Sequence, residues 1–374
     1  MVQKARRYRW HHLGLSLLAW TAAALLFSLV RLYGVEEEAL YRLQATPQSV
    51  LHTILAQGLV GGLLFGGLFG LTNLALDRFT SRETPYWIIL LIRVLAHVLL
   101  AVLIVAVLLL IPHWLRGENL EGRVLPMLLE GPTSKTALVI LVYTGLWSVM
   151  FSLLRQINDM FGPGIMVNIL RGKYHQPQEE ERIFMFLDLK SSTTYAERLG
   201  HVLYSELIQD CFVDLTEAIE KHDVEVYQYV GDEAVLTWQA KEGLRDFNCL
   251  EAFYTFEATI QRKARYYFDK YNLVPAFKAG LNVGLVMVAE VGVVKKEIAY
   301  HSDVLSTAAR IQSECNKLGQ KLLISEALLA RLPDMGHYQI REEGSFTLRG
   351  KRQEVVIYSV NPPHPVPHRF AFAE

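Results

Sequence analysis

The sequence has little cysteine and no excess of charge of either sign. Three cysteines, Cys211, Cys249 and Cys315, are widely spaced among 374 residues. No Cys-x-x-Cys pair or Cys/His cluster is present, which argues against a structural zinc site and against a disulfide framework. An odd number of unpaired cysteines suits a reducing compartment. The formal net charge of −1 gives no indication of nucleic-acid binding, so no nucleic-acid partner is expected.

Charge is scarcest in the first half of the chain, which contains four long apolar stretches. Each stretch has about the 20 residues that a helix needs to cross a bilayer. We therefore predict a transmembrane domain over residues 1–155, with spans near 13–32, 51–74, 87–111 and 136–154. The first stretch lacks a clear small-residue cleavage site and precedes further spans. It therefore indicates an uncleaved anchor and not a signal peptide.

Basic residues in the short loops predict the orientation of these spans. Lys and Arg are concentrated before the first span, whereas Glu36 to Glu38 make the first loop acidic. Arg78 and Arg82 follow the second span, and Arg171 and Lys173 follow the fourth. We expect a multi-pass protein of the inner (plasma) membrane, with its N-terminus and its second half in the cytoplasm.

Two features of the spans have alternative interpretations. Small residues in "GLVGGLLFGGLFG" (58–70) allow close helix approach, either in a tight helix or dimer seam or as ordinary packing inside the bundle. Arg93 and His97 lie one helical turn apart in the third span. Ionisable groups at that depth usually face the bundle interior, although Arg93 is near enough to the cytoplasmic end to snorkel.

Residues 156–181 are predicted to form a cytoplasmic helical linker. Gly162-Pro163-Gly164 breaks the helix that leaves the membrane, "IMVNILRGKYH" is consistent with a short amphipathic helix, and "QPQEEER" reads as a polar hinge. Such a segment either transmits a change from the bundle or serves as a passive tether. The tail, residues 362–374, is Pro-rich and predicted to be extended.

Two aspartates in the second half are predicted to lie at strand ends. "RIFMFLDLKSST" reads as a buried strand that ends at Asp188, followed by a helix start where Ser and Thr can cap the helix and backbone N–H groups suit phosphate oxygens. "VEVYQYVGDEAVLTW" reads as a hairpin with Asp232 at its tip. Each aspartate alone has a simpler explanation, as a helix cap or a solvated turn, and Glu233 suits a salt bridge. Together the aspartates suggest a two-metal site for phosphate chemistry.

The order of these motifs resembles the class III nucleotidyl (adenylate and guanylate) cyclase catalytic domain. The resemblance continues through the strand "FKAGLNVGLVMVAEVG", the helix "YHSDVLSTAARIQSECN" and the closing "LRGKRQEVVIYSV". It covers residues 182–361, nearly all of the second half. It implies an α+β fold, in which the four-helix transmembrane bundle precedes a ferredoxin-like, palm-type sheet flanked by helices. Two such domains would pair as a homodimer and build active sites from both copies.

The resemblance also implies a role for individual residues. Asp188, the backbone of Leu189 and Asp232 would hold two Mg²⁺ or Mn²⁺ ions per active site. Four further positions, Ser191, Ser192, Thr193 and Lys351, would bind the substrate phosphates, and Arg310 would stabilise the transition state. The implied reaction converts a nucleoside triphosphate, ATP by default, into a 3′,5′-cyclic nucleotide and pyrophosphate.

Three positions depart from the family pattern. Gln228 and Ala299 occupy the base-reading positions but do not match the usual adenine or guanine code, because Gln both donates and accepts and Ala does neither. Ser306 occupies the position of an Asn that places the ribose. A guanylate cyclase, a CTP or UTP cyclase, and a signalling pseudoenzyme that binds nucleotide without turnover therefore remain alternatives.

Overall fold

A computed structural model provides the structure of the chain. It describes residues 2–33, 47–79, 84–115, 135–161, 168–169, 171–333, 338–347 and 354–362. The chain divides into two compact units, Met1–Met160 and Phe161–Glu374, each of which is considered by itself below. Gly162-Pro163-Gly164, residues 165–167 and 170 of the predicted amphipathic helix, Lys351 and nearly all of the tail lie outside the described residues.

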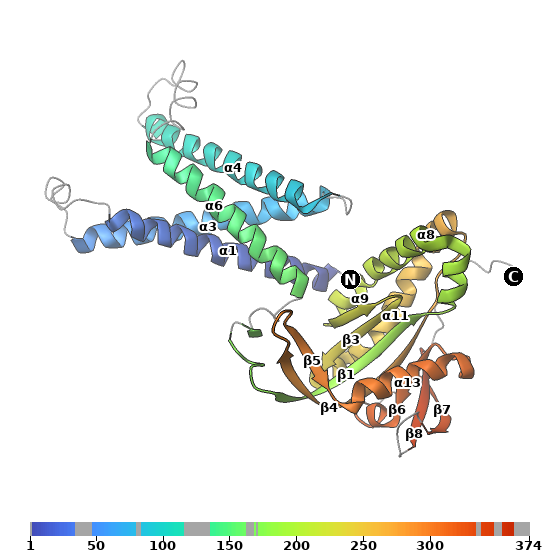
Figure 1. The fold of residues 1–374 in the computed structure, drawn as a ribbon. Helices are drawn as coiled ribbons and strands as arrows, with labels where there is room; N and C mark the ends of the chain where they lie inside the picture. The colour runs from blue at the N-terminus through green and yellow to red at the C-terminus, as the bar shows by residue number, and fades with distance from the viewer. Residues whose placement is uncertain are drawn as a thin grey trace. The chain divides into compact units, whose positions relative to one another are not determined.

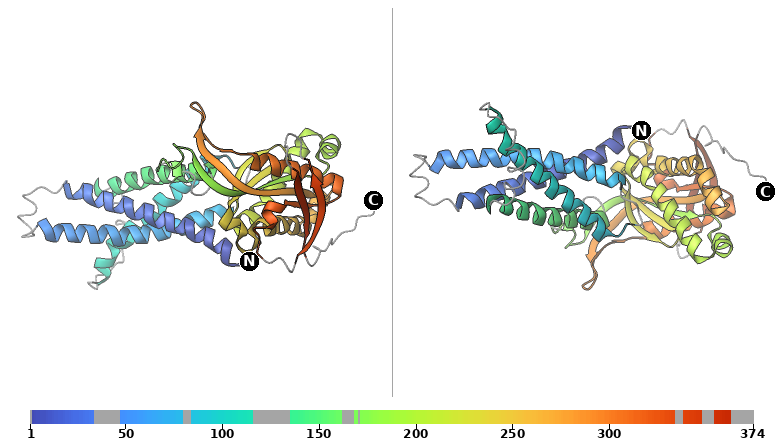
Figure 2. Two further views of the ribbon diagram at one scale, coloured as in Figure 1. Left: turned by 90° about the horizontal axis from the view of Figure 1, so that it is seen from below. Right: turned by 90° about the horizontal axis from the view of Figure 1, so that it is seen from above.

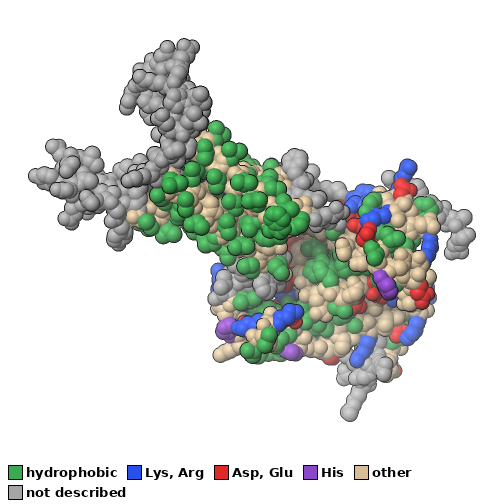
Figure 3. All heavy atoms as spheres, turned by 45° about the horizontal axis from the view of Figure 1, so that its top comes forward, with side chains coloured by type: hydrophobic (Ala, Val, Ile, Leu, Met, Phe, Trp, Pro, Cys, Tyr) green, Lys and Arg blue, Asp and Glu red, His purple; other side chains and the backbone are tan. Residues whose placement is uncertain are grey.

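The described residues of the first unit form four long helices. They are α1 (Val2–Tyr33), α3 (Pro47–Phe79), α4 (Tyr86–Leu115) and α6 (Lys135–Phe161). All four are long and apolar enough to cross a membrane, over Leu13–Val30, Gly58–Asp77, Tyr86–Ile104 and Leu138–Asn158. Hydrophobic side chains cover the face of this unit shown in Figure 3. An apolar surface of this extent is unfavourable in water. The helices therefore indicate membrane association.

Glycines of α3 form the contact between α3 and α1, which lie side by side (Figures 1 and 2). A Cβ atom at Gly62 would lie 2.6 Å from the Cα of Thr21, and one at Gly66 would lie 2.8 Å from the Cα of Leu17. These contacts are with backbone, which cannot move aside as a flexible side chain can. The predicted seam of small residues is therefore used within the chain, as helix packing inside the bundle.

We expect Gly62→Ala to destabilise the bundle by about 1–3 kcal/mol, the usual cost of overpacking. The added methyl group would push α1 away from α3. Gly61→Ala is the matched control, because a Cβ at Gly61 meets nothing within 4 Å. Thermal unfolding of the two purified variants in the same detergent measures the difference. Equal melting temperatures would show that α1 and α3 are not packed this closely.

The ionisable residues of the third span face the bundle interior. Arg93 donates to Asp77 of α3 at 2.7 Å, and Arg155 of α6 approaches the other oxygen of the same carboxylate at 2.5 Å. His97 is fully buried, stacks on Phe69 and lies 2.7 Å from the hydroxyl of Ser148 on α6. Arg93 thus forms a partly buried ion pair inside the bundle, although the sequence also allowed it to snorkel.

The second unit is built on one mixed sheet. Its strand order is β2-β3-β1-β4-β6-β8-β7, with β5 paired to β4. The strands are β1 (Gln178–Leu189), β2 (Glu225–Val230), β3 (Glu233–Gln239), β4 (Phe277–Val291), β5 (Glu297–His301), β6 (Leu322–Ser325), β7 (Gln339–Phe346) and β8 (Val355–Asn361). The central position of β1 explains its continuous apolar sequence, because both of its faces are covered.

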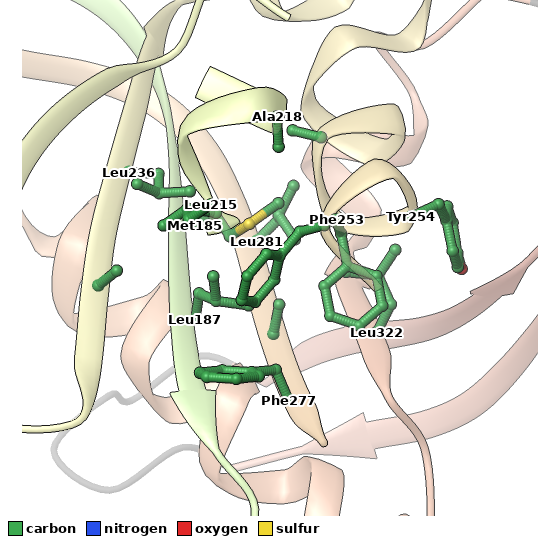
Figure 4. Close-up of a cluster of buried hydrophobic side chains, with 14 of the residues drawn as sticks. Met185, Leu187, Leu215, Ala218, Leu236, Phe253, Tyr254, Phe277, Leu281 and Leu322 are labelled. Atoms are coloured by element: carbon green, nitrogen blue, oxygen red, sulfur yellow. The ribbon is translucent and has the colours of Figure 1, made fainter. Parts of the chain in front are cut away.

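Helices cover both faces of this sheet (Figures 1 and 2). The helices of one face are α8 (Ser192–Asp214), α9 (Thr216–Lys221), α10 (Ala240–Leu244), the short 3-10 helix η2 (Arg245–Phe247), α11 (Asn248–Arg262) and α12 (Ala264–Tyr271). On this side Met185 and Leu187 of β1 pack against Phe253 of α11, as Figure 4 shows. The other face is covered by α13 (Asp303–Leu318), where Phe184 packs against Val304. The short α14 (Glu326–Leu329) follows β6.

Two boundaries differ from the prediction. The segment predicted as a polar hinge enters β1 at Gln178, and Gln178 to Glu181 pair with β4. Backbone hydrogen bonds hold this polar segment in the sheet. The sequence did not predict it because the segment has no alternating apolar residues. The helix predicted to follow the strand of Asp188 divides into α8 and α9, and α8 itself is kinked at Gly200, whose φ is +72°.

Candidate active site

Asp188 stands near the end of β1, on the face covered by α13. Its carboxylate Oδ2 accepts a hydrogen bond from Nε2 of Gln312 at 2.8 Å and forms an ion pair with Nζ of Lys278 at 3.1 Å. Lys278 lies directly opposite Asp188 on β4, and Glu233 lies directly opposite it on β3. Opposed residues in antiparallel strands share a face of the sheet, so these three charged side chains form a row across β3, β1 and β4.

Asp232 lies in the two-residue turn between β2 and β3, beside this row. The turn places Val230 opposite Glu233. Gly231 supplies the positive φ, +60°, that a tight hairpin turn of this kind requires. The Oδ2 atom of Asp232 is buried and has no hydrogen-bond partner. A buried, unpartnered carboxylate oxygen is costly unless a cation or a donor approaches it.

The electrostatics indicate that the carboxylates converge. Burial raises the pKa of Asp188, Lys278 lowers it, and the neighbouring Asp232 raises it again. Burial raises the pKa of Glu233 to about 7, with further contributions from Asp188 and Asp232. Burial and the nearby Asp232 also raise the pKa of Tyr204 on α8. Glu233 was predicted as a salt-bridge partner, but it makes no ion pair with a residue that the structure describes.

Asp188 and Asp232 fit a divalent cation. The unpartnered Oδ2 of Asp232 and the mutual repulsion of the carboxylates are what a bound cation would relieve. Among the described residues no group of three or more His, Cys, Asp or Glu side chains is arranged around a metal. A site with so few protein carboxylates suits Mg²⁺, which binds one or two of them together with substrate phosphates and water. The carbonyl of Leu189, the remaining predicted ligand, belongs to the last residue of β1.

The predicted phosphate-binding turn lies beside Asp188. Ser191 adopts a left-handed conformation, with φ of 61°, and its side chain does not cap α8. Ser192 begins the helix, Thr193 is exposed, and Ser192 lies within hydrogen-bonding reach of Tyr204. The first N–H groups of α8 therefore lack a side-chain cap, which is the condition under which a helix start binds phosphate oxygens.

Arg310 and Ser306 lie on a different face of α13 from Gln312. They are four residues apart and so share one face of the helix. Gln312, two residues beyond Arg310, is on the opposite side and contacts Asp188. A single chain therefore does not bring Arg310 and Ser306 to the carboxylates. The hydroxyl of Ser306 donates to the carbonyl of Asp303 at 2.9 Å.

The segments that carry the predicted base-reading residues approach each other. Gln228 is exposed on β2, and Ala299 is on β5, with β3, β1 and β4 between them in the sheet. The rings of the adjacent Tyr227 and Tyr300 nevertheless contact edge to face, with centroids 4.9 Å apart. Lys351 lies outside the described residues.

Sequence reasoning missed Lys278, Gln312 and Tyr204. Lys278 begins a strand that was recognised, but its partner Asp188 is 90 residues earlier in the sequence and is identified only by strand pairing. Gln312 was within the recognised helix, where it carries no motif of its own. A helical-face analysis of α13 would have separated it from Arg310, but not shown what it contacts.

Comparisons with known proteins place this geometry in a family. Residues 174–362 match the adenylate and guanylate cyclase catalytic domain. Adenylate cyclase 2 of Rhizobium meliloti (strain 1021) is 30% identical over 224 residues, which are 60% of this chain and 62% of that protein. Adenylate cyclase 1 of the same organism is 23% identical over 187 residues, 48% of this chain and 27% of that protein. The chain thus spans less than two thirds of each of these curated relatives.

A solved structure shares the fold. A bacterial light-regulated adenylyl cyclase superposes with a TM-score of 0.50 at 16% identity, covering 60% of this chain and 66% of that one. At this identity the likeness supports the fold alone. Together with the match over 174–362, it confirms the predicted α+β cyclase fold behind four N-terminal apolar helices. The chain therefore belongs to the family of adenylate and guanylate cyclase catalytic domains.

Proposed function

We propose that the chain is a membrane-anchored nucleotidyl cyclase that converts ATP into 3′,5′-cyclic AMP and pyrophosphate at a homodimer interface. In this reaction the ribose 3′ oxygen forms a bond to the α-phosphorus. The bond from that phosphorus to the bridging oxygen of the β-phosphate breaks, and the proton of the 3′ hydroxyl passes to solvent. Positioning and charge stabilisation would supply most of the rate enhancement.

One observation carries this proposal: Asp188 and Asp232 converge, and Oδ2 of Asp232 is buried without a partner. Divalent cations bound there would neutralise charge that develops on the phosphate oxygens. The chain's own residues would do the rest. The uncapped start of α8 would hold phosphate oxygens, and the two carboxylates would keep the cations against the triphosphate.

The positions of Arg310 and Ser306 support the proposed homodimer. These side chains face away from the Asp188 carboxylate of their own chain, which contacts the opposite face of α13 at Gln312. An arginine that stabilises charge on the transferred phosphorus must lie close to the cations. A second copy of the chain would supply it, and each active site would then combine the carboxylates of one copy with α13 of the other.

ATP is the proposed substrate because a relative that is 30% identical is named an adenylate cyclase. The exposed Gln228 amide both donates and accepts, so it is compatible with several bases. Conversion of GTP, CTP or UTP is the alternative within the same chemistry. A nucleotide-binding pseudoenzyme is favoured by one observation, since the Ser306 hydroxyl already bonds the Asp303 carbonyl within its own helix.

Product analysis tests the proposal. The purified full chain would be incubated with Mn²⁺ and with ATP, GTP, CTP or UTP separately, and the products identified by mass. We expect a cyclic product, with the highest rate from ATP. A higher rate from another triphosphate would change the base but keep the mechanism. Nucleotide binding without a cyclic product from any of the four would instead establish the pseudoenzyme.

A further inference from the structure

The two oxygens of the Asp188 carboxylate have different surroundings. Oδ2 is held twice, by Nε2 of Gln312 at 2.8 Å and by Nζ of Lys278 at 3.1 Å. Oδ1 takes part in neither of these contacts, and the Asp232 side chain lies within hydrogen-bonding reach of the Asp188 carboxylate. A carboxylate gripped through one oxygen has its orientation fixed and its other oxygen available.

The two residues that hold Oδ2 come from different elements, a neighbouring strand and a helix that covers the sheet. Strand pairing places Lys278 on β4, directly opposite Asp188. Gln312 lies on α13. Its side chain reaches the sheet because Gly280 of β4 has no side chain and lets the helix approach closely. A Cβ atom at Gly280 would overlap the backbone of Gln312 itself. The close approach of α13 to β4 thus sets the position of the Gln312 amide.

Gln312 and Lys278 contribute differently to this contact. Lys278 brings a positive charge, which compensates Asp188 but also repels a divalent cation nearby. Gln312 is neutral, and because a carboxylate only accepts hydrogen bonds, the amide must present its N–H₂ group. Gln312 therefore affects a cation at Asp188 by orienting the carboxylate and not by adding charge. Gln312 and Lys278 are both buried residues, so water does not substitute readily for the amide.

We propose that Gln312 is a positioning residue, which holds Oδ2 of Asp188 so that Oδ1 is presented to the cation shared with Asp232. The inference rests on the proposed function, since it concerns the same cation site. Partners that orient metal ligands from outside are generally worth about 10–100-fold in metal affinity. Gln312 touches neither the cation nor the nucleotide in this account.

The test is Mn²⁺ binding by Gln312→Met, measured with the metal alone on the purified full chain from the spectroscopic signal of free Mn²⁺. Methionine preserves the length of the side chain and removes the donor. We expect the affinity for Mn²⁺ to fall by about 10-fold or more. The Mn²⁺ concentration that gives half-maximal cyclase rate should rise by a similar factor, a larger change than that in kcat. A residue that only supports packing would lower the melting temperature and leave the Mn²⁺ affinity unchanged.

Two further variants separate the ways in which the idea can fail. Asn316→Leu removes an exposed amide one turn along the same helix and should bind Mn²⁺ like the native chain. Asp232→Asn should lose Mn²⁺ binding, and if it does not, the cation site and the proposed function are both wrong. If Asp232→Asn loses binding while Gln312→Met retains native affinity, the positioning role alone is wrong. Should Gln312→Met fail to fold, Gln312→Asn, which is one methylene too short to reach Asp188, gives the same comparison.

Discussion

Replacing Asp232 with asparagine is expected to reduce formation of the cyclic nucleotide by more than about 100-fold. The loss of a residue that merely orients a metal ligand costs about 10–100-fold in affinity or activity, and a direct ligand should cost more. Asparagine has the same shape as aspartate but no charge, so it fills the turn after Gly231 without holding a cation. The measurement is the initial rate of cyclic product formation at saturating Mn²⁺. Asp188→Asn is expected to show the same loss.

The same substitution is expected to leave the fold intact. Asp232 raises the pKa of Asp188 and that of Glu233, which means that the three carboxylates repel one another in the absence of a cation. Removing one of these charges relieves that repulsion. The melting temperature of metal-free Asp232→Asn should therefore equal or exceed that of the native chain, which is a common relation between stability and active-site charge.

A matched variant shows whether the position matters and not the charge alone. Asp269→Asn removes one exposed acid on α12, which among the described residues pairs with Arg265 of the same helix, in (i, i+4) spacing at 3.5 Å. It should keep native activity. Full activity of Asp232→Asn, with Asp269→Asn as the reference, would exclude Asp232 from the site and with it the proposed cyclase mechanism.

The sequence was sufficient to predict the parts of the site that depend on local order. The apolar run before Asp188 required a buried strand, and Gly231-Asp232 between two β-rich segments required a hairpin. Both were found as predicted. Lys278 and Gln312 were not predicted, because their importance comes from contacts across 90 and 124 residues of sequence. Such contacts depend on which strand pairs with which and on how closely a helix approaches the sheet.

The membrane helices follow the same rule. Composition and length predicted four spans, and four helices of the described residues meet both criteria. Small residues predicted that some helices would pack closely, but not that the partner of α3 would be α1 of the same chain. The ion pairs of Arg93 and Arg155 with Asp77 were missed, because Asp77 is at the end of a span where an acid looks like part of the loop.

Asp77→Asn is expected to destabilise the bundle by about 1.5–3 kcal/mol, the usual contribution of hydrogen bonds to charged groups, because the two ion pairs are partly buried. Asp77 is the only residue that joins Arg93 of α4 to Arg155 of α6 among the ion pairs of the described residues. Without its charge, the attraction that joins the guanidinium groups of Arg93 and Arg155 to α3 is lost. Thermal unfolding of the full chain in detergent measures the loss.

A variant that removes all three charges distinguishes two causes of this destabilisation: uncompensated charge and simple loss of contact. Replacement of a complete buried ion network by apolar residues is often neutral or stabilising, because the cost of burying the charges also disappears. A triple variant, Asp77→Leu with Arg93→Leu and Arg155→Leu, should therefore melt closer to the native chain than Asp77→Asn does. If the single variant melts at the native temperature, the carboxylate of Asp77 does not hold α4 and α6 to α3. If the triple variant is less stable than Asp77→Asn, the three charged side chains stabilise the bundle by more than neutralising one another.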